Sequence, residues 1–246
     1  MSGSFWSHFL DLLFPPKCVF CGRVLNSGES GICPECQGAL PWLTETEAEQ
    51  RGEFFSLCVS PLRYQDRVRD SIHRYKFSGR QGYARIYGRL MAQCISDRLA
   101  GRYDLITWVP LSRERKRERG YDQAFLLANA AALALGDVAV ETLRKARDTR
   151  AQSGLDGEPA RRANVLGAYE IVDPELIEGK RVLLIDDVIT TGATISECAR
   201  LLRTFGAADV VCATLARAHK NFLWYYWKAA RKRPELIGQK KTTATI

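Results

Sequence analysis

Two nearly unbroken apolar segments, Arg181–Ile185 and Asp209–Leu215, constrain the fold of this chain more than any other feature. Each has the length of a strand, and a helical pattern lies between them at Ala193–Phe205, followed by Gly206. Strands that are apolar throughout and that alternate with helices are typical of a parallel sheet buried on both faces. The sequence therefore predicts an α/β fold.

The same alternation extends toward the N-terminus. Further strands are expected at Phe55–Leu62, Leu105–Val109 and Val138–Leu143, and further helices near Arg67–Lys76, Tyr83–Leu99 and Asp122–Leu135. Asp122 can cap the start of the last of these helices, and Gly136 lies just past its end. The segment Arg144–Asn164 has charges, Gly and Pro without periodicity, which predicts a long surface loop.

Four cysteines form two closely spaced pairs, Cys18-x-x-Cys21 and Cys33-x-x-Cys36, with eleven residues between them. Each pair can chelate from one tight turn, so together they offer four thiolates to a tetrahedral Zn²⁺. The alternatives are a redox-active pair or two disulfides, but a thioredoxin-like motif needs one such pair beside a βαβ pattern, which is absent here. The sequence therefore predicts a small zinc knuckle over residues 15–41. The remaining cysteines have apolar neighbours and are expected in the core: Cys58, Cys94, Cys198 and Cys212.

Composition divides the chain into three parts. Residues 1–52 are expected to hold an amphipathic helix at Phe5–Phe14, the zinc knuckle and a polar linker at Thr44–Gly52. Residues 53–218 carry the strands and helices, and residues 219–246 form a basic, aromatic tail. No apolar run reaches the ~18 residues of a membrane span, and the N-terminal residues lack the basic start and cleavage site of a signal peptide. We therefore expect a cytoplasmic protein.

The net charge of +8 comes mostly from the C-terminal end. From Arg217 onward there are eight Lys or Arg residues and one acid, which leaves 28 basic and 27 acidic residues in the rest of the chain. The segment Asn221–Arg233 joins aromatic residues to cations. That combination suits single-stranded nucleic acid, an anionic membrane surface, or a helix that docks its aromatic side chains on the protein, and the sequence leaves all three open.

The segment Val182–Thr194 carries the clearest chemistry. A buried strand ends in Asp186-Asp187 and leads through Thr190-Thr191-Gly192 into a helix. Backbone N–H groups at such a turn, together with threonine hydroxyls, suit a phosphate group, and glycine permits a positive φ. Two carboxylates beside a phosphate are favourable if the ligand also has hydroxyls or if Mg²⁺ mediates, which indicates a sugar phosphate. An ordinary strand–turn–helix connection is the alternative.

Several motifs, in order along the chain, carry a family resemblance. Ile185–Thr194 looks like the 5-phosphoribosyl-1-pyrophosphate (PRPP) loop of type I phosphoribosyltransferases. Val109–Arg113 with Arg119–Ala124, and Arg147–Leu155 with Arg161–Asn164, match as well. With the cysteine knuckle in front, the chain to about Ala218 resembles the ComF family of competence-associated proteins. The resemblance implies a parallel-sheet type I phosphoribosyltransferase-like domain preceded by a four-cysteine zinc ribbon.

The resemblance also implies roles for single residues. Asp186 and Asp187 would be the catalytic acids that hold the ribose hydroxyls, directly or around Mg²⁺. The other implied substrate-binding residues are Thr190, Thr191, Gly192, Ala193 and Thr194 at the 5′-phosphate, Arg113 and Arg119 at the pyrophosphate, Lys76, and Arg147 and Gln152 in a mobile hood. The cations between Arg113 and Arg119 alternate with acids, so a solvated face is the alternative for them. Members of the family commonly have Asn in place of Asp122.

Together with the resemblance, the acidic loop and the cationic segment of one α/β sheet predict a Mg²⁺-dependent phosphoribosyltransferase, a pentosyl (glycosyl) transferase that uses PRPP. The resemblance also implies a link to DNA uptake in natural transformation. The alternative is a competence accessory or nucleic-acid-binding protein without catalysis, in which the PRPP site is regulatory or vestigial. The predicted partners are PRPP or a related sugar phosphate, single-stranded DNA and DNA-uptake proteins.

Overall fold

A six-stranded sheet carries the fold, in the order β1-β2-β8-β7-β4, with β3 also paired to β8. The strands are β1 (Glu49–Gln50), β2 (Leu57–Val59), β3 (Leu62–Arg63), β4 (Leu105–Trp108), β7 (Arg181–Ile189) and β8 (Asp209–Arg217). The pairing of β1 with β2 is antiparallel and every other pair in this sheet is parallel. This is the computed structural model of the chain, and it describes residues 15–147, 163 and 165–218.

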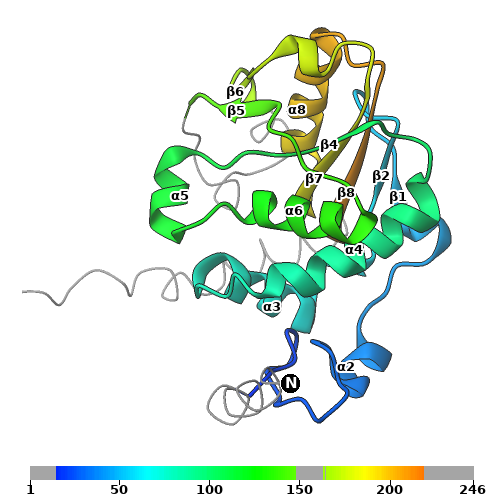
Figure 1. Cartoon of the computed structure of the whole chain (residues 1–246), viewed down its shortest axis with the longest axis vertical. Helices are drawn as coiled ribbons and strands as arrows, with labels where there is room; N and C mark the ends of the chain where they lie inside the picture. Colours follow the sequence, from blue (N-terminus) through cyan, green and yellow to red (C-terminus); the bar gives the residue numbers. More distant parts are fainter. Residues whose placement is uncertain (1–14, 148–162, 164, 219–246) are drawn as a thin grey trace, which may run out of the picture.

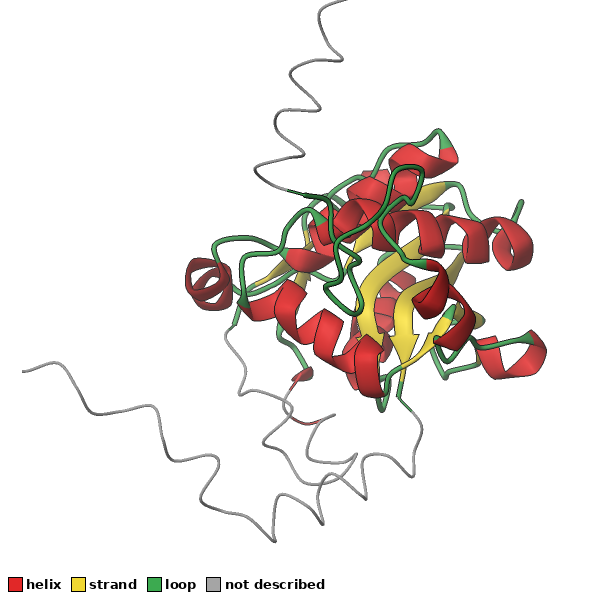
Figure 2. Ribbon diagram, turned by 90° about the horizontal axis from the view of Figure 1, so that it is seen from below, coloured by secondary structure: helices red, strands yellow, loops and turns green. Residues whose placement is uncertain are grey.

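Helices cover both faces of the sheet (Figures 1 and 2). α4 (Tyr83–Leu99) and α6 (Gln123–Leu135) pack together on one face, and α8 (Ala193–Thr204) packs on the other. Successive residues of β7 point alternately to the two faces, with Leu183 in the α4–α6 core and Val182 in the α8 core. The parallel sheet buried on both faces, predicted from the continuous apolar strands, is therefore confirmed.

The predicted helix at Asp122–Leu135 has the expected ends. The Asp122 carboxylate accepts the N–H groups of Ala124 and Phe125, and Gly136 takes a left-handed conformation at φ 74°. Of the predicted strand Phe55–Leu62, only Leu57–Val59 and Leu62 are in strands, which are separated around Pro61, because proline has no N–H to donate to a ladder.

Three segments differ from their predicted structure. The strand expected at Val138–Leu143 forms only in part. Ala139 makes a single parallel bridge with Ile106 of β4, and the Val140 N–H donates to the Ile106 carbonyl at 2.8 Å, but Val138 is 70% exposed. A regular strand begins only at Leu143, where β5 (Leu143–Lys145) pairs antiparallel with β6 (Tyr169–Ile171). The first residues of the predicted surface loop therefore lie in a strand. The predicted linker at Thr44–Gly52 contains a short 3-10 helix, η1 (Glu45–Ala48), and β1. The charged segment after β4, for which the sequence pattern predicted no secondary structure, forms α5 (Arg113–Arg119), because Ser112 caps its start and Gly120, at φ 78°, ends it.

The cysteine knuckle lies apart from the sheet, and α3 (Asp66–Phe77) runs between them (Figure 1). The knuckle contains α2 (Pro34–Ala39). Far from it along the chain, a second 3-10 helix, η3 (Pro174–Leu176), precedes β7. Within the described ranges, none of the helices has the length and apolar character needed to cross a bilayer. The predicted helix at Phe5–Phe14, Gln152 and the tail 219–246 lie outside the described residues.

Candidate sugar-phosphate site and zinc knuckle

Two predicted ligand-binding loops meet at the carboxyl ends of β4 and β7. The strands are parallel neighbours, with Trp108 opposite Ile185, and the Val109 N–H donates to the Ile185 carbonyl at 2.9 Å. The segment after β4 therefore begins beside Asp186. In open α/β sheets this edge is where ligands bind.

The two acids at this edge have different surroundings. Asp187 is 6% exposed, and its Oδ1 accepts a hydrogen bond from Lys76 Nζ at 2.7 Å. Its Oδ2 is buried and has no partner among the described residues. Asp186 Oδ1 accepts the N–H of Asp187 at 2.8 Å. Burial and the nearby Asp187 carboxylate raise the pKa of Asp186 well above its ordinary value of 3.8. A bound cation or a hydroxyl donor would give Asp187 Oδ2 a partner and would stabilise the charged form of Asp186.

The turn after the acids forms the start of α8. Gly192 is the residue before the helix and has φ 80°, a conformation that favours glycine. A side chain there would not clash, since the nearest heavy atom to an added Cβ, Gln50 Nε2, is 3.7 Å away. Glycine is therefore required by the backbone rather than by crowding. The other residues predicted at the phosphate line this turn and the first turn of α8: Thr190, Thr191, Ala193 and Thr194.

The two predicted pyrophosphate ligands lie at opposite ends of α5. Arg119 is half-buried, with its guanidinium 4.8 Å from the centroid of the Phe77 ring. Burial lowers the pKa of Arg119, and the carboxylate of Asp187 opposes that shift, so the two charges interact. The middle of α5 is mostly solvent-exposed, as the alternative of a solvated face requires: Glu114, Lys116, Arg117 and Glu118.

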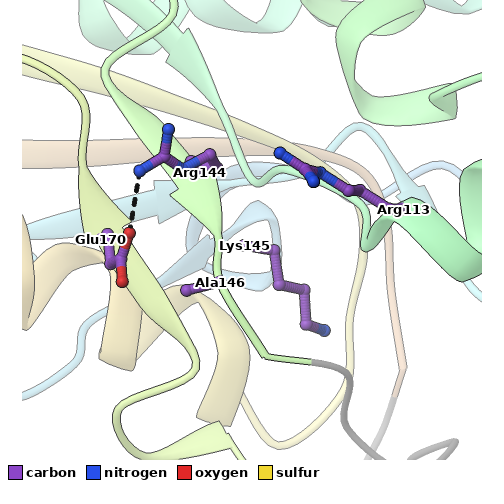
Figure 3. A pocket seen from close by; sticks show the side chains of 5 residues that line it. All are labelled: Arg113, Arg144, Lys145, Ala146 and Glu170. Atoms are coloured by element: carbon purple, nitrogen blue, oxygen red, sulfur yellow. Dashed lines mark hydrogen bonds and ion pairs between the residues drawn. The ribbon is translucent and has the colours of Figure 1, made fainter.

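Arg113 is exposed and lines a cavity of about 380 Å³ (Figure 3). The other lining residues are Arg144 and Lys145 of β5, Ala146 directly after it, and Glu170 of β6. The side chains of Arg144 and Glu170 form an ion pair at 3.0 Å. Lys145 Nζ lies 5.2 Å from the centroid of the Tyr169 ring. Sequence reasoning missed Arg144 and Lys145, because it assigned them to a loop, and only their pairing with β6 brings them opposite α5.

Arg147 has a structural contact at the start of the segment predicted as a hood. Its guanidinium donates to the Leu166 carbonyl at 2.7 Å, and its N–H donates to the Ala168 carbonyl. Gly167 in turn donates its N–H to Glu197 of α8 at 2.9 Å. Arg147 therefore ties the two sides of this segment together at its base, while its predicted contact with substrate stays a prediction.

The Asp122 side chain accepts hydrogen bonds from backbone N–H groups of two segments. Its Oδ1 accepts the N–H groups of Ala124 and Phe125, both at 3.1 Å, and its Oδ2 accepts the N–H of Leu111 at 3.0 Å. The carboxylate thus fastens the segment after β4 to the start of α6. The amide of Asn has one acceptor oxygen only, so it could not satisfy both sides.

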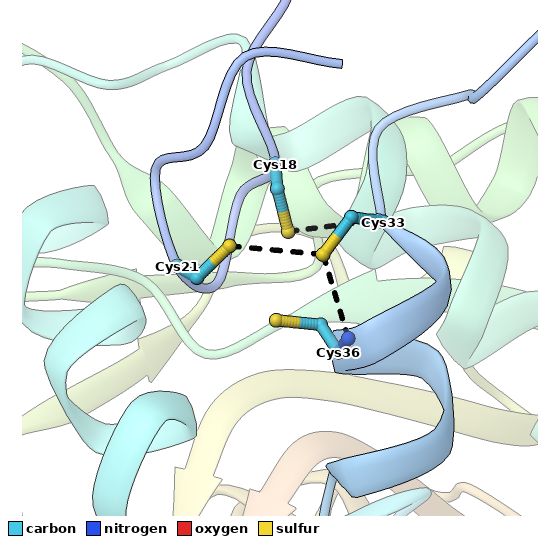
Figure 4. A group of neighbouring side chains, drawn as sticks. All are labelled: Cys18, Cys21, Cys33 and Cys36. Atoms are coloured by element: carbon cyan, nitrogen blue, oxygen red, sulfur yellow. Dashed lines mark hydrogen bonds between the residues drawn. The ribbon is translucent and has the colours of Figure 1, made fainter. Parts of the chain in front are cut away.

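The four cysteine sulfurs of the knuckle converge on one point (Figure 4). All four Sγ atoms lie within 4.8 Å of one another, and each cysteine is a free thiol. The N–H groups of Cys33 and Cys36 donate to sulfur atoms of Cys18 and Cys33, both at 3.4 Å, and Arg67 donates to Cys36 Sγ at 3.5 Å. Donors around clustered sulfurs stabilise thiolates, so this set fits a closed tetrahedral zinc site. The other four cysteines are buried in the core, as expected.

Comparison with known proteins agrees with these two parts. The family described as "Double zinc ribbon domain" matches residues 9–56, and the "Phosphoribosyl transferase domain" matches residues 122–233. A Salmonella typhimurium relative named "DNA utilization protein YhgH" is 32% identical over 209 residues, which are 80% of this chain and 90% of the relative. Haemophilus influenzae "Competence protein F" is 28% identical over 224 residues, covering 82% of this chain and 97% of the relative. This chain belongs to the ComF family.

Membership confirms the architecture expected from the motifs, a phosphoribosyltransferase-like domain preceded by a zinc ribbon with four clustered cysteines. A third relative of the family, Streptococcus pneumoniae "Competence protein ComFC", is 27% identical over 232 residues, covering 82% of this chain and the whole of the relative. The names of these ComF relatives connect them with competence and with DNA utilization.

Proposed function

We propose that this ComF protein binds PRPP together with Mg²⁺ at the carboxyl ends of β4 and β7 and acts as a phosphoribosyltransferase. One observation carries the proposal: Asp186 and Asp187 lie near the carboxyl end of β7, which continues to Ile189 instead of ending at the acids as the sequence predicted, and Asp187 keeps a buried oxygen without a partner among the described residues. A carboxylate in that state is suited to accept a ribose hydroxyl or to ligate a cation. The turn at Gly192 and the start of α8 lie directly beyond it for the 5′-phosphate.

The chain's own residues would contribute mainly by positioning and charge. Arg113 and Arg119 are the first and last residues of α5 and would meet the negative charge that develops on departing pyrophosphate. Mg²⁺ bound with the substrate would further neutralise the charge of that pyrophosphate. Lys76 pairs with one oxygen of Asp187, so it would hold the acid in place while a ligand engages the second oxygen.

The test is a calorimetric titration of PRPP with Mg²⁺ into zinc-loaded protein. Asp187→Asn, alone and with Asp186→Asn, should reduce the affinity at least tenfold. Asp104→Asn is the matched control, because it removes a carboxylate that pairs with Arg181 at the opposite ends of the same strands. Absence of binding to the unsubstituted protein would overturn the proposal.

We also propose that the protein takes part in DNA uptake, as the names of its relatives indicate for them, with single-stranded DNA or DNA-uptake proteins as partners. The cations of α5 and of β5 support a contact with phosphate groups. Binding to a labelled single strand should weaken steeply with added salt if phosphate contacts carry it. Failure to bind at low salt would favour a role confined to small ligands. The cytoplasmic location remains a prediction.

A further inference from the structure

Helix α3 holds the backbone of the first metal-binding turn. Ser71 Oγ donates to the carbonyl of Val19, and Arg74 Nη2 donates to the carbonyls of Val19 at 3.2 Å and Phe20 at 2.7 Å. Val19 and Phe20 are the two residues between Cys18 and Cys21. The helix therefore holds the loop whose shape a metal ion would fix.

The next residues of the same helix contact three segments of the sugar-phosphate site. Tyr75 Oη donates to the carbonyl of Gln123 at the start of α6 at 2.8 Å. Lys76 makes the ion pair with Asp187 of β7, and the Phe77 ring lies beneath Arg119 of α5. The knuckle contacts, made by Ser71 and Arg74, and the site contacts, made by the next three residues, thus lie within about two successive turns of one helix.

The packing between these two sets of contacts is tight. Ser71 Oγ also lies 2.5 Å from Tyr87 Oη, and the Tyr87 ring contacts both Phe20 and Tyr75, at centroid distances of 5.9 and 5.5 Å. Ser71, Tyr75 and Tyr87 are each fully buried. Because a packed helix moves as a rigid element, a shift of the turn cannot be absorbed locally.

We propose that Ser71 and Arg74 are positioning residues that couple the zinc knuckle to the Lys76–Asp187 pair through α3. With metal bound, the Cys18–Cys21 turn is fixed, its two carbonyls hold α3 in register, and Lys76 is held against Asp187. Loss of metal frees the turn, and Lys76 separates from Asp187. The coupling acts in both directions, since a ligand that fixes one end of α3 must strengthen the other by the same factor.

The first test uses chemical labelling of lysine amines, read residue by residue by mass spectrometry, and needs no PRPP. In zinc-loaded protein the paired Lys76 should label slowly compared with the exposed Lys180. Arg74→Ala should raise Lys76 labelling at least threefold while retaining one equivalent of zinc. Arg74→Lys should restore most of the protection, because an ammonium can still donate to the carbonyls.

Two controls separate coupling from unfolding. Arg69→Ala removes a cation of the same helix that pairs with its neighbour Asp70, and it should leave Lys76 labelling unchanged. Half-buried Lys145, on β5, reports the state of the domain and should keep its labelling rate in every variant. Unchanged Lys76 labelling in Arg74→Ala, or a rise of Lys145 and Lys76 together, would overturn the proposal.

The second test measures the reverse direction. Saturating PRPP and Mg²⁺ should slow zinc transfer to a chromophoric chelator by about fivefold or more in the unsubstituted protein, within the usual range of coupling between sites. In Arg74→Ala, the rate of zinc transfer should be nearly the same with and without PRPP and Mg²⁺. PRPP that binds without slowing zinc release would contradict the coupling. If PRPP does not bind at all, the proposed function fails, and the labelling experiment still decides the inference.

Discussion

The ion pair between Lys76 and Asp187 allows a quantitative test of the site's electrostatics. Lys76→Met keeps the aliphatic stem and removes the ammonium, which leaves Asp187, 6% exposed, without a partner among the described residues for either oxygen. Breaking a buried pair costs about 3–5 kcal/mol, whereas an exposed pair contributes about 0–1 kcal/mol. Because Lys76 is 21% exposed, we expect an intermediate loss of about 2 kcal/mol in the free energy of unfolding, or roughly 4–8 °C in Tm.

Asp187→Asn should behave differently. Its amide oxygen can still accept from Lys76, and the substitution removes the charge that raises the pKa of Asp186. We therefore expect a stability within about 1 kcal/mol of the unsubstituted protein, together with loss of PRPP binding. The double variant Lys76→Met/Asp187→Asn should be more stable than Lys76→Met alone, because no unpaired carboxylate then remains at position 187.

The assay is urea unfolding of the four zinc-loaded proteins, followed by tryptophan fluorescence, with slopes compared to confirm that the unfolding transition is unchanged. Lys180→Met, at an exposed position, is the control for loss of a lysine charge. Equal midpoints for Lys76→Met and the unsubstituted protein would refute the reasoning. So would a double variant that is less stable than Lys76→Met, because the unpaired carboxylate would then carry no cost.

Three further predictions concern the knuckle, the cap of α6 and the acids. The purified protein should hold one equivalent of zinc, and Cys36→Ser should lose most of it and unfold at a lower temperature, because such sites supply ~10–16 kcal/mol of apparent folding free energy. Metal analysis that finds less than one equivalent, with intact thiols, would contradict the zinc site. Asp122→Asn should cost about 1–2 kcal/mol in thermal unfolding, because its amide nitrogen would face the N–H of Leu111; an unchanged Tm would argue against this double capping role. Burial and the Asp187 carboxylate raise the pKa of Asp186 above 3.8, so the folded protein keeps a proton there that the unfolded chain has lost. The free energy of unfolding, measured without ligand, should therefore fall as the pH rises from 3.8 toward that raised pKa. Binding of Mg²⁺ with PRPP should release the proton. Calorimetry in two buffers of different ionisation enthalpy checks this release, and equal heats would contradict it.

Local patterns were sufficient to predict much of the fold. The continuous apolar runs predicted the parallel sheet, and the capping residues Asp122 and Gly136 predicted both ends of α6. The same kind of signal was present around α5, where Ser112 and Gly120 bracket the helix, but the density of charge between them drew the interpretation toward ligand binding. The spacing of the four cysteines predicted their convergence.

Contacts between distant segments could not be predicted in this way. Lys76 and Asp187 are 111 positions apart, and nothing in the neighbourhood of either residue names the other as its partner. The pairing of β5 with β6 likewise joins Arg144 to Glu170 across 26 positions. Both depend on how helices and strands pack after they form, which sequence periodicity does not encode.

The distribution of unsatisfied polar groups gives an independent argument about the site. Among the described residues, three buried side-chain atoms have no hydrogen-bond partner: Tyr121 Oη, Gln123 Oε1 and Asp187 Oδ2. Elsewhere in the interior such groups are paired, as Ser60 is with Thr214 at 2.7 Å.

The three unpaired atoms belong to neighbouring segments. Tyr121 and Gln123 lie on either side of Asp122, the residue that caps α6, and Tyr75 of α3 donates to the Gln123 carbonyl. Asp187 lies two residues before the end of β7 and pairs with Lys76, the residue after Tyr75. Each such group costs about 1–3 kcal/mol, so a sequence selected only for stability would not gather them here. A polar ligand that meets these groups would account for that concentration, and the sugar hydroxyls of PRPP have the donors that Asp187 Oδ2 lacks.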